Sequence, residues 1–342
     1  MQLFKWLWRF LFLALTLIGA AAGGIYYGIT QPILIAEPTT YEVQPGYTPT
    51  RIGSQMAARG WIYHPLLVRV ASRLNPQWVP KMGEYELTPG MTVMDVLAKF
   101  DSGQAIHYSV TLLEGKTTQE FLETLANKRN IEMTLLGQSN NQIAASLELG
   151  VANAEGQFFA DTYRYFAGDT DVQILKRANA KLNTVLMSHW AQKNARLPFS
   201  SAYDALIMAS IIEKETGAAH ERPLIAKVFF NRLKLNIRLQ TDPTVIYGLG
   251  DSYDGNLTRK GLRSKSPYNT YRIYGLPPTP IANVGEEAIA AAINPGETDA
   301  LYFVAKGDGT HEFSRTLKEH NAAVAKYQRF KRRSDYTSSP AQ

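Results

Sequence analysis

Two glutamates at the end of one apolar segment are the residues of this chain best suited to chemistry. Glu213 and Glu215 close the segment DALIMASIIEKETG, and on a helix they lie about 160° apart. Glu215 shares the more apolar face with Ile211 and Ile212, where burial raises the pKa of a carboxyl group. The negative end of the helix dipole acts in the same direction. We therefore predict Glu215 as a general acid that protonates a glycosidic oxygen.

A polar stretch, residues 239–285, follows this segment and is dense in Thr, Asp, Asn, Tyr and Pro. Amide and hydroxyl groups among aromatic rings suit the hydroxyls, acetamido groups and pyranose rings of sugars. We predict that Asp242 is the N-cap of a helix starting at Pro243. The substrate-binding residues expected in this stretch are Gln240, Thr241, Asp242, Tyr268, Asn269 and Tyr271.

Both features also have plainer interpretations. Glu215 could be a helix-end residue paired with Lys214 or Arg222, and a tyrosine-rich loop could simply be packed.

The composition excludes several classes of catalytic site. The chain has no Cys, which excludes thiol nucleophiles, disulfides, iron–sulfur clusters and Cys-ligated zinc. It has six scattered His and contains no HExxH, G-x-S-x-G or phosphate-loop motif. We expect no metal and no cofactor, and carboxylate chemistry is what remains. A net charge of +6 is too diffuse to indicate nucleic acid as a partner.

The elements that must position these residues suggest an α+β fold. A chain of 342 residues exceeds the usual ~150 residues of one domain. We expect a catalytic α+β domain over residues 106–333 and a disordered tail over 334–342. A β-hairpin is expected around ALYFVAK and HEFS, with its turn at 306–310. Helices are expected at 171–190, 204–215, 222–235, 285–293 and 316–329.

The N-terminal region reads as a membrane anchor. Residues 10–29 are uncharged and almost all apolar, and about 20 residues span a ~30 Å hydrocarbon core. Lys5 and Arg9 precede this run, whereas the next basic residue is Arg51, so residues 1–9 are expected in the cytoplasm. The catalytic domain is then periplasmic, on a single-pass protein of the cell inner membrane. The alternative is a signal peptide cleaved near the small residues 20–22.

A strand–turn–helix pattern recurs after the anchor. Pro-Gly-x-Thr occurs at 45–48 and 89–92, and Gly115 and Thr117 form a third variant. Gly supplies the turn, Thr caps the helix, and the spacing from Thr117 to Glu120 is that of a capping box. This is either local capping chemistry alone or a module. Near the N-terminus of an exported chain it looks like a LysM module, which binds N-acetylated glycans. We predict a LysM-like βααβ module over 38–105.

Eight short motifs, in chain order, carry a family resemblance. ASIIEKET, FFNRL, LQTDPTVIYG, YNTY, GLPP, NPG, LYFV and EHN resemble the MltG, or YceG-like, family of endolytic murein transglycosylases. The likeness extends over the whole chain. It implies one catalytic glutamate, the second of the Glu-Lys-Glu triplet, which is Glu215. Ala160 stands where the family usually carries Pro, and Thr279 stands where it usually carries Gly, so the backbone at these turns departs from the pattern.

The resemblance implies a non-hydrolytic reaction. Such an enzyme cleaves the β-1,4 bond from N-acetylmuramic acid (MurNAc) to N-acetylglucosamine (GlcNAc) in nascent peptidoglycan, leaves a 1,6-anhydro-MurNAc end and terminates strand elongation. The expected partners are peptidoglycan glycan strands and peptidoglycan synthases, the penicillin-binding proteins. Two alternatives remain open. One is a muramidase, a hydrolase with Asp242 as its second carboxylate. The other is a non-catalytic glycan-binding scaffold of the wall-synthesis machinery.

Overall fold

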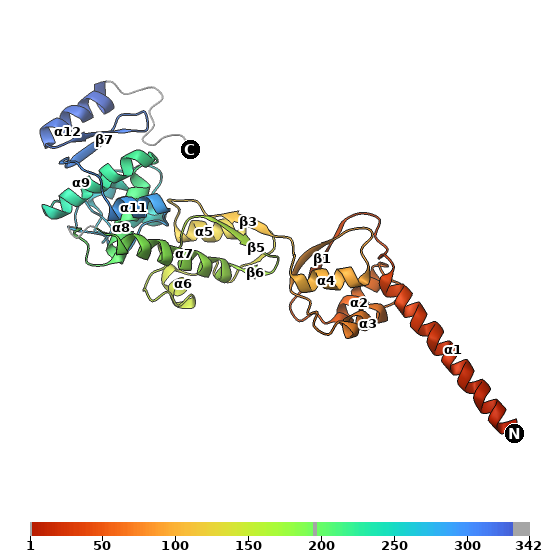
Figure 1. The fold of residues 1–342 in the computed structure, drawn as a ribbon. Helices are drawn as coiled ribbons and strands as arrows, with labels where there is room; N and C mark the ends of the chain where they lie inside the picture. The colour runs from red at the N-terminus through yellow and green to blue at the C-terminus, as the bar shows by residue number, and fades with distance from the viewer. Residues whose placement is uncertain (1, 194–196, 331–342) are drawn as a thin grey trace. The chain divides into compact units, whose positions relative to one another are not determined.

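The computed structural model describes residues 2–193 and 197–330, and the chain folds into two compact units (Figure 1). The first unit contains the chain up to Tyr108 together with the short segments Arg129–Glu132 and Arg164–Asp169. The second unit contains the rest. Both units mix helices with short strands, so the expected α+β class is confirmed at that level.

The first unit pairs two strands and packs helices against them. Strands β1 (Thr39–Val43) and β2 (Gly83–Leu87) are antiparallel neighbours. Between them lie α2 (Pro49–Ala58) and α3 (Leu66–Leu74), and α4 (Val93–Ser102) follows β2. The expected βααβ order is therefore present. Its kinship to LysM modules and its glycan binding stay predictions. The rings of Tyr41, Tyr85 and Phe100 are fully buried and pack together in the core of the unit.

The N-terminal helix α1 (Gln2–Thr30) precedes this unit. Residues Phe4–Thr30 are long and apolar enough to cross a membrane, which no other helix in the described part of the chain achieves. The helix is compatible with a single-pass membrane anchor, and it is longer than the apolar run 10–29 from which it was predicted.

The recurring turns behave as the sequence predicts. Thr48, Thr92 and Thr117 are N-cap residues, and each hydroxyl accepts a hydrogen bond from the backbone N–H three residues further on. The glycines that precede them adopt the left-handed backbone conformation, with φ of 78°, 93° and 73° at Gly46, Gly90 and Gly115. Local chemistry accounts for all three turns.

The second unit is mainly helical, with strands only in short pairs. Strand β3 (Tyr108–Thr111) pairs with β5 (Thr162–Tyr165), and β4 (Ile131–Glu132), which belongs to the first unit, pairs with β6 (Asp169–Thr170). Strands β7 (Tyr302–Ala305) and β8 (His311–Ser314) form the predicted antiparallel hairpin. The helices are α5 (Thr118–Ala126), α6 (Asn140–Ser146), α7 (Asp171–Ala191), α8 (Ala202–Glu215), α9 (Arg222–Lys234), α10 (Asp242–Leu249), α11 (Glu286–Ile293) and α12 (Leu317–Val324). Short 3-10 helices span Ala219–Glu221, Gly250–Ser252 and Gly261–Arg263.

Helix α8 lies at the centre of this unit. Its residues from Ala205 to Ile212 are all buried, and α7, α9 and α11 pack around it (Figure 1). The helices predicted at 171–190, 204–215, 222–235 and 285–293 are confirmed to within two residues at each end. This buried segment leads directly into the last turn of α8, which carries Glu213 and Glu215.

Two local predictions need correction. The helix expected over 316–329 is α-helical only to Val324, and a π-helical turn continues over Ala325–Phe330. Asp242 is not the N-cap of α10, because that position belongs to Thr241 and Asp242 is the first helical residue. The carboxylate of Asp242 instead accepts a hydrogen bond of 2.6 Å from the Tyr271 hydroxyl, which draws it away from the helix end. The predicted disordered tail lies outside the described residues.

Candidate active site

A cavity of about 320 Å³ in the second unit contains Glu215. Its wall is assembled from the end of α8, one face of α9, the loop before α10, the loop at Tyr271, the β7 strand and α12. The lining contains both aromatic or aliphatic side chains and polar ones. Its residues are Glu215, Val228, Phe229, Arg232, Leu239, Gln240, Thr241, Asp242, Tyr271, Leu301, Tyr302, Phe303, Leu317 and His320.

Glu215 is the last residue of α8, and its carboxyl group accepts a hydrogen bond from the Thr241 hydroxyl. Burial raises the pKa of Glu215 to about 7, the Thr241 hydrogen bond lowers it, and the charge of Asp242 raises it. Near neutral pH both protonation states of Glu215 are therefore accessible. A group that must first give and then take a proton works best under this condition.

The loop that carries Thr241 is held in an unusual conformation. Gln240 has φ of 54°, in the left-handed region that costs a residue other than glycine about 1–3 kcal/mol. Its side-chain amide oxygen accepts a hydrogen bond from the guanidinium group of Arg232. Arg232 is only 6% exposed and also donates to the carbonyl oxygens of Arg238 and Leu301, at 2.9 and 2.8 Å. Arg232 thus joins α9 to the loop that delivers Thr241 to Glu215.

Glu213 has different surroundings and does not line the cavity. One of its oxygens forms a 2.8 Å ion pair with Arg222, and the other accepts the backbone N–H of Gly285 at 3.1 Å. Arg222 also binds Glu287 and lies 3.6 Å from Glu114. Burial raises the pKa of Glu213, while Arg222 lowers it. The two glutamates therefore face different partners, as their spacing predicts.

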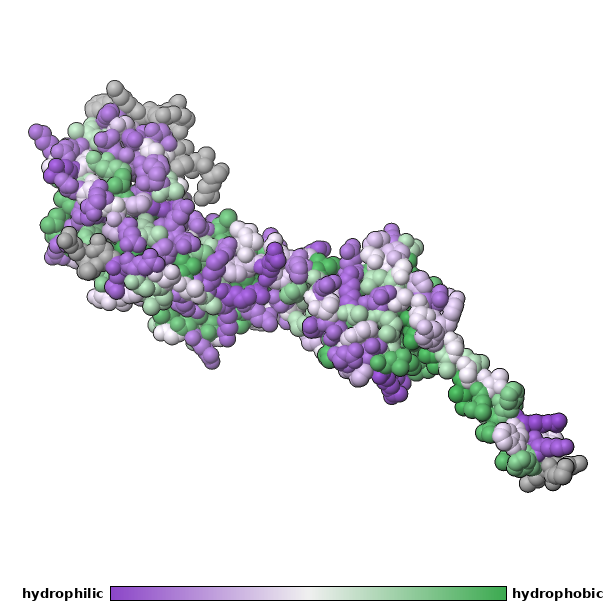
Figure 2. Space-filling model, in the orientation of Figure 1, coloured by the Kyte–Doolittle hydropathy of each residue, from purple (hydrophilic) through white to green (hydrophobic). Residues whose placement is uncertain are grey.

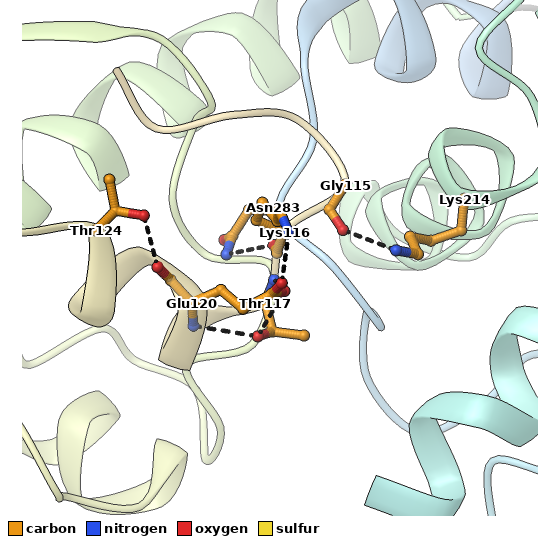
Figure 3. Close-up of polar contacts among 7 residues, drawn as sticks. All are labelled: Gly115, Lys116, Thr117, Glu120, Thr124, Lys214 and Asn283. Atoms are coloured by element: carbon orange, nitrogen blue, oxygen red, sulfur yellow. Dashed lines mark hydrogen bonds and ion pairs between the residues drawn. The ribbon is translucent and has the colours of Figure 1, made fainter. Parts of the chain in front are cut away.

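Lys214, between the two glutamates, attaches the helix end to another part of the unit. Its ammonium group donates to the carbonyl oxygen of Gly115 at 3.0 Å (Figure 3). The same figure shows the Asn283 amide donating to the Lys116 carbonyl, at 3.1 Å, just before the capping box at the start of α5. Since Arg222 pairs with Glu213 and Lys214 binds Gly115, neither cation holds Glu215 in the described contacts.

The structure brings together five of the seven residues predicted for the site, namely Glu215, Gln240, Thr241, Asp242 and Tyr271. Tyr268 and Asn269 lie outside this cavity. Asn269 is fully buried and accepts the backbone N–H of Tyr271 at 3.0 Å, so it shapes the loop that presents Tyr271. Tyr268 packs on the ring of Tyr247, with centroids 4.8 Å apart. A direct substrate contact for these two residues stays a prediction.

Three polar residues of the cavity were not predicted as site residues: Arg232, Tyr302 and His320. The rings of Tyr302 and His320 stack with their centroids 5.2 Å apart. The guanidinium carbon of Arg232 lies over the Tyr302 ring, 5.2 Å from its centroid. Burial lowers the pKa of His320, and the charge of Arg232 acts in the same direction, so both favour the neutral imidazole. The motifs FFNRL, LYFV and EHN contain these residues and were the available signal.

Within residues 2–193 and 197–330, no group of three or more His, Asp or Glu side chains is arranged to hold a metal ion. The cavity offers instead one carboxyl group of raised pKa, a hydroxyl bound to it, a second carboxylate on Asp242 and a wall of aromatic side chains. This arrangement can transfer a proton to and from a polar ligand that also stacks on rings.

The chain belongs to a known family. A sequence model of the YceG-like family matches residues 41–326, and the chain is therefore a member of that family. A protein of Bacillus subtilis (strain 168) named endolytic murein transglycosylase is 35% identical over 262 residues, 72% of each chain. A protein of the same name from Streptococcus pneumoniae (serotype 2, strain D39) is 24% identical over 322 residues. That match covers 84% of this chain and 58% of the pneumococcal one.

A solved structure supports the same grouping. The crystal structure of a YceG-like protein from Listeria monocytogenes aligns with a TM-score of 0.51 and 28% sequence identity. The alignment covers 84% of this chain and 99% of the Listeria chain.

Proposed function

We propose that this protein is an endolytic murein transglycosylase that cleaves the MurNAc–GlcNAc β-1,4 bond of peptidoglycan and leaves a 1,6-anhydro-MurNAc end. The observation that carries the proposal is the state of Glu215, whose pKa is raised to about 7 in a cavity lined by aromatic and hydroxyl side chains. The names of the relatives point to the same class of reaction.

One carboxyl group suffices for such a reaction. Protonated Glu215 donates its proton to the glycosidic oxygen, and the bond from that oxygen to the anomeric carbon of MurNAc breaks. The resulting Glu215 carboxylate then accepts the proton of the MurNAc 6-hydroxyl, whose oxygen bonds to the anomeric carbon and closes the anhydro ring. Every proton is returned, no water is consumed, and Glu215 ends in its starting state.

The surrounding residues support this cycle. The Thr241 hydroxyl stabilises the carboxylate form of Glu215, whereas Asp242 stabilises the protonated form. Their opposing effects keep the pKa near neutrality, where a group that serves as acid and then as base is most effective. Tyr271 and Tyr302 offer ring faces and hydroxyls on the wall of the cavity, as sugar rings require.

A muramidase remains the second candidate, because Asp242 lies close enough to raise the pKa of Glu215 and could serve as a second carboxylate. The test is mass spectrometry of peptidoglycan digested with the purified protein. A transglycosylase releases fragments with 1,6-anhydro ends, 18 Da lighter than the reducing ends that a hydrolase leaves, by loss of one water molecule. Reducing ends alone would refute the proposal. Intact peptidoglycan with the wild type would instead favour a binding scaffold.

The cellular setting belongs to the same proposal. Helix α1 would anchor the protein in the cell inner membrane, with Lys5 and Arg9 on the cytoplasmic side and the second unit in the periplasm. From there the enzyme would act on nascent glycan strands and end their elongation beside the penicillin-binding proteins that synthesise them. The βααβ part of the first unit would assist by holding the glycan. Deleting residues 38–105 should then weaken binding to the wall more than turnover of short fragments.

A further inference from the structure

The end of helix α1 is part of the hydrophobic core of the first unit. Ile29 and Ile33 are 3% and 4% exposed and belong to the same buried cluster as Tyr41 and Phe100. A Cβ atom on Gly28 would come within 2.7 Å of Leu67, so the backbone of α1 packs directly on α3. The globular part of the unit therefore begins at the last turn of the helix.

Backbone hydrogen bonds secure the residues that follow α1. The N–H of Ile33 donates to the Met91 carbonyl and that of Leu34 to the Trp61 carbonyl, both at 2.7 Å. These bonds attach the chain after α1 to two separate loops of the unit. The helix and the βααβ part consequently form one body, with the exit segment built into it.

The surface beside this junction is apolar and exposed. Tyr63 is 78% exposed, Leu34 is 49% exposed, and with Tyr27 they line a groove of about 520 Å³. Leu66, at the start of α3, is also exposed. Figure 2 shows hydrophobic surface continuing from α1 onto the adjoining part of the first unit. Leu34, Tyr63 and Leu66 are called the apolar rim below.

The length of α1 determines where the apolar rim lies relative to the bilayer that the helix would span. The almost entirely apolar run 10–29 ends at Ile29, before the polar residues Thr30 and Gln31. Its residues rise by about 1.5 Å each, enough to cross a ~30 Å hydrocarbon core. The turn that contacts Leu67 is therefore the turn that leaves the hydrocarbon. Tyrosine and leucine side chains at that level suit the boundary between headgroups and acyl chains.

We propose that the apolar rim of Leu34, Tyr63 and Leu66 rests in the headgroup boundary of the same bilayer that α1 spans. This inference depends on the proposed anchor. The first unit then lies on the membrane surface and is not tethered at a distance from it. Its occupant is lipid, because Leu34 and Tyr63 line the same groove as Tyr27 of α1, and large exposed apolar patches mark such interaction sites.

The absence of Cys permits a direct test with single cysteines in the full-length chain. Tyr63→Cys reports on the rim. Leu74→Cys is the matched control, because Leu74 is 64% exposed and lies at the other end of α3. Leu17→Cys reports on the middle of α1. Each variant is spin-labelled in phosphatidylethanolamine–phosphatidylglycerol vesicles, and collisions with oxygen and with a water-soluble nickel chelate are compared.

The expected result is a ratio of oxygen to nickel collisions that is several-fold higher at residue 63 than at residue 74, and highest at residue 17. A label at residue 63 that is as accessible to nickel as residue 74, with residue 17 in hydrocarbon, would overturn the inference and leave the anchor standing. A label at residue 63 shielded from both reagents would mean a protein occupant and would also overturn it. Nickel access at residue 17 would refute the anchor and the inference together.

Discussion

The last turn of α8 carries two glutamates, one on each side, and their electrostatic surroundings are opposite. Glu213 faces the Arg222 guanidinium and the N–H of Gly285, whereas Glu215 faces the Thr241 hydroxyl and lies near the Asp242 carboxylate. Burial raises the pKa of both carboxyl groups, but only Glu213 has a cation beside it. Helix geometry separates the two groups, and their neighbours make Glu213 an ion-pair partner and give Glu215 the raised pKa of the proposed proton donor.

The first test of this contrast is the loss of the proton donor. Glu215→Gln keeps the shape of the side chain but cannot transfer a proton, so activity on peptidoglycan should fall roughly 10²–10⁴-fold or more. Mass spectrometry of the digest measures the loss, and circular dichroism should show an intact fold. If the Glu215→Gln variant stayed active, Glu215 would not be the proton donor.

Glu213→Gln tests the other side and should act on stability. Removing one partner of a buried ion pair costs about 3–5 kcal/mol. Arg222 retains Glu287 and Glu114, so we expect a loss of about 2 kcal/mol in the free energy of unfolding. Urea denaturation measures this loss. Below the melting temperature the variant should keep most of its activity, and a folded but inactive Glu213→Gln protein would reverse the assignment of the two glutamates.

Glu215 should carry a stability cost that depends on pH. The carboxyl group has a pKa near 4.5 in the unfolded chain and about 7 in the folded one, so the folded chain binds more protons between these values. Stability contributed by the protonated group is therefore lost as the pH rises from 4.5 to 7. Glu215→Gln should stabilise the fold more at pH 8 than at pH 5, by up to about 2 kcal/mol. Equal stabilisation at both pH values would mean that the pKa is not raised.

Thr241→Val sharpens the comparison on the catalytic side. The variant removes the hydroxyl that stabilises the Glu215 carboxylate, so the pKa should rise further and the alkaline limit of kcat/KM should move above pH 7. Activity should fall about tenfold, because the Glu215 carboxylate is the base of the proposed second step. Thr244→Val is the matched control, since Thr244 is equally buried and bonds to the Thr241 carbonyl instead of to Glu215. If Thr241→Val and Thr244→Val gave the same pH profile of kcat/KM, Thr241 would only shape the loop and would not set the pKa of Glu215.

Asp242→Asn should change activity the least of these variants, and it should shift the pKa of Glu215 in the direction opposite to Thr241→Val. Without the neighbouring negative charge the pKa of Glu215 should fall, which moves the alkaline limit of kcat/KM below pH 7. Most of the activity at pH 6 should remain. Abolished activity with an intact fold would instead favour the muramidase mechanism, in which Asp242 is the second carboxylate.

Local sequence patterns were sufficient for much of this molecule. The helices at 171–190 and 204–215, the threonine caps and the hairpin at β7 and β8 follow from spacings within a few residues, where side chain and backbone interact directly. The difference between Glu213 and Glu215 belongs to the same class, because two positions on one helix differ in angle whatever packs around them. Asp242 marks the limit, since the N-cap position belongs to Thr241 and the Asp242 carboxylate binds the hydroxyl of Tyr271, a residue distant in the chain.

The sequence by itself determined which carboxyl group points into the apolar side of α8, where the principal helices begin and end, and that one terminal helix can span a bilayer. Only the tertiary structure decided what surrounds them. It placed Arg232, Tyr302 and His320 in the cavity of Glu215, buried Asn269 behind it and set the end of α1 into the first unit. These contacts join residues far apart in the chain. Such contacts form only when separate elements pack, so no local spacing encodes them, and the pKa of Glu215 depends on them.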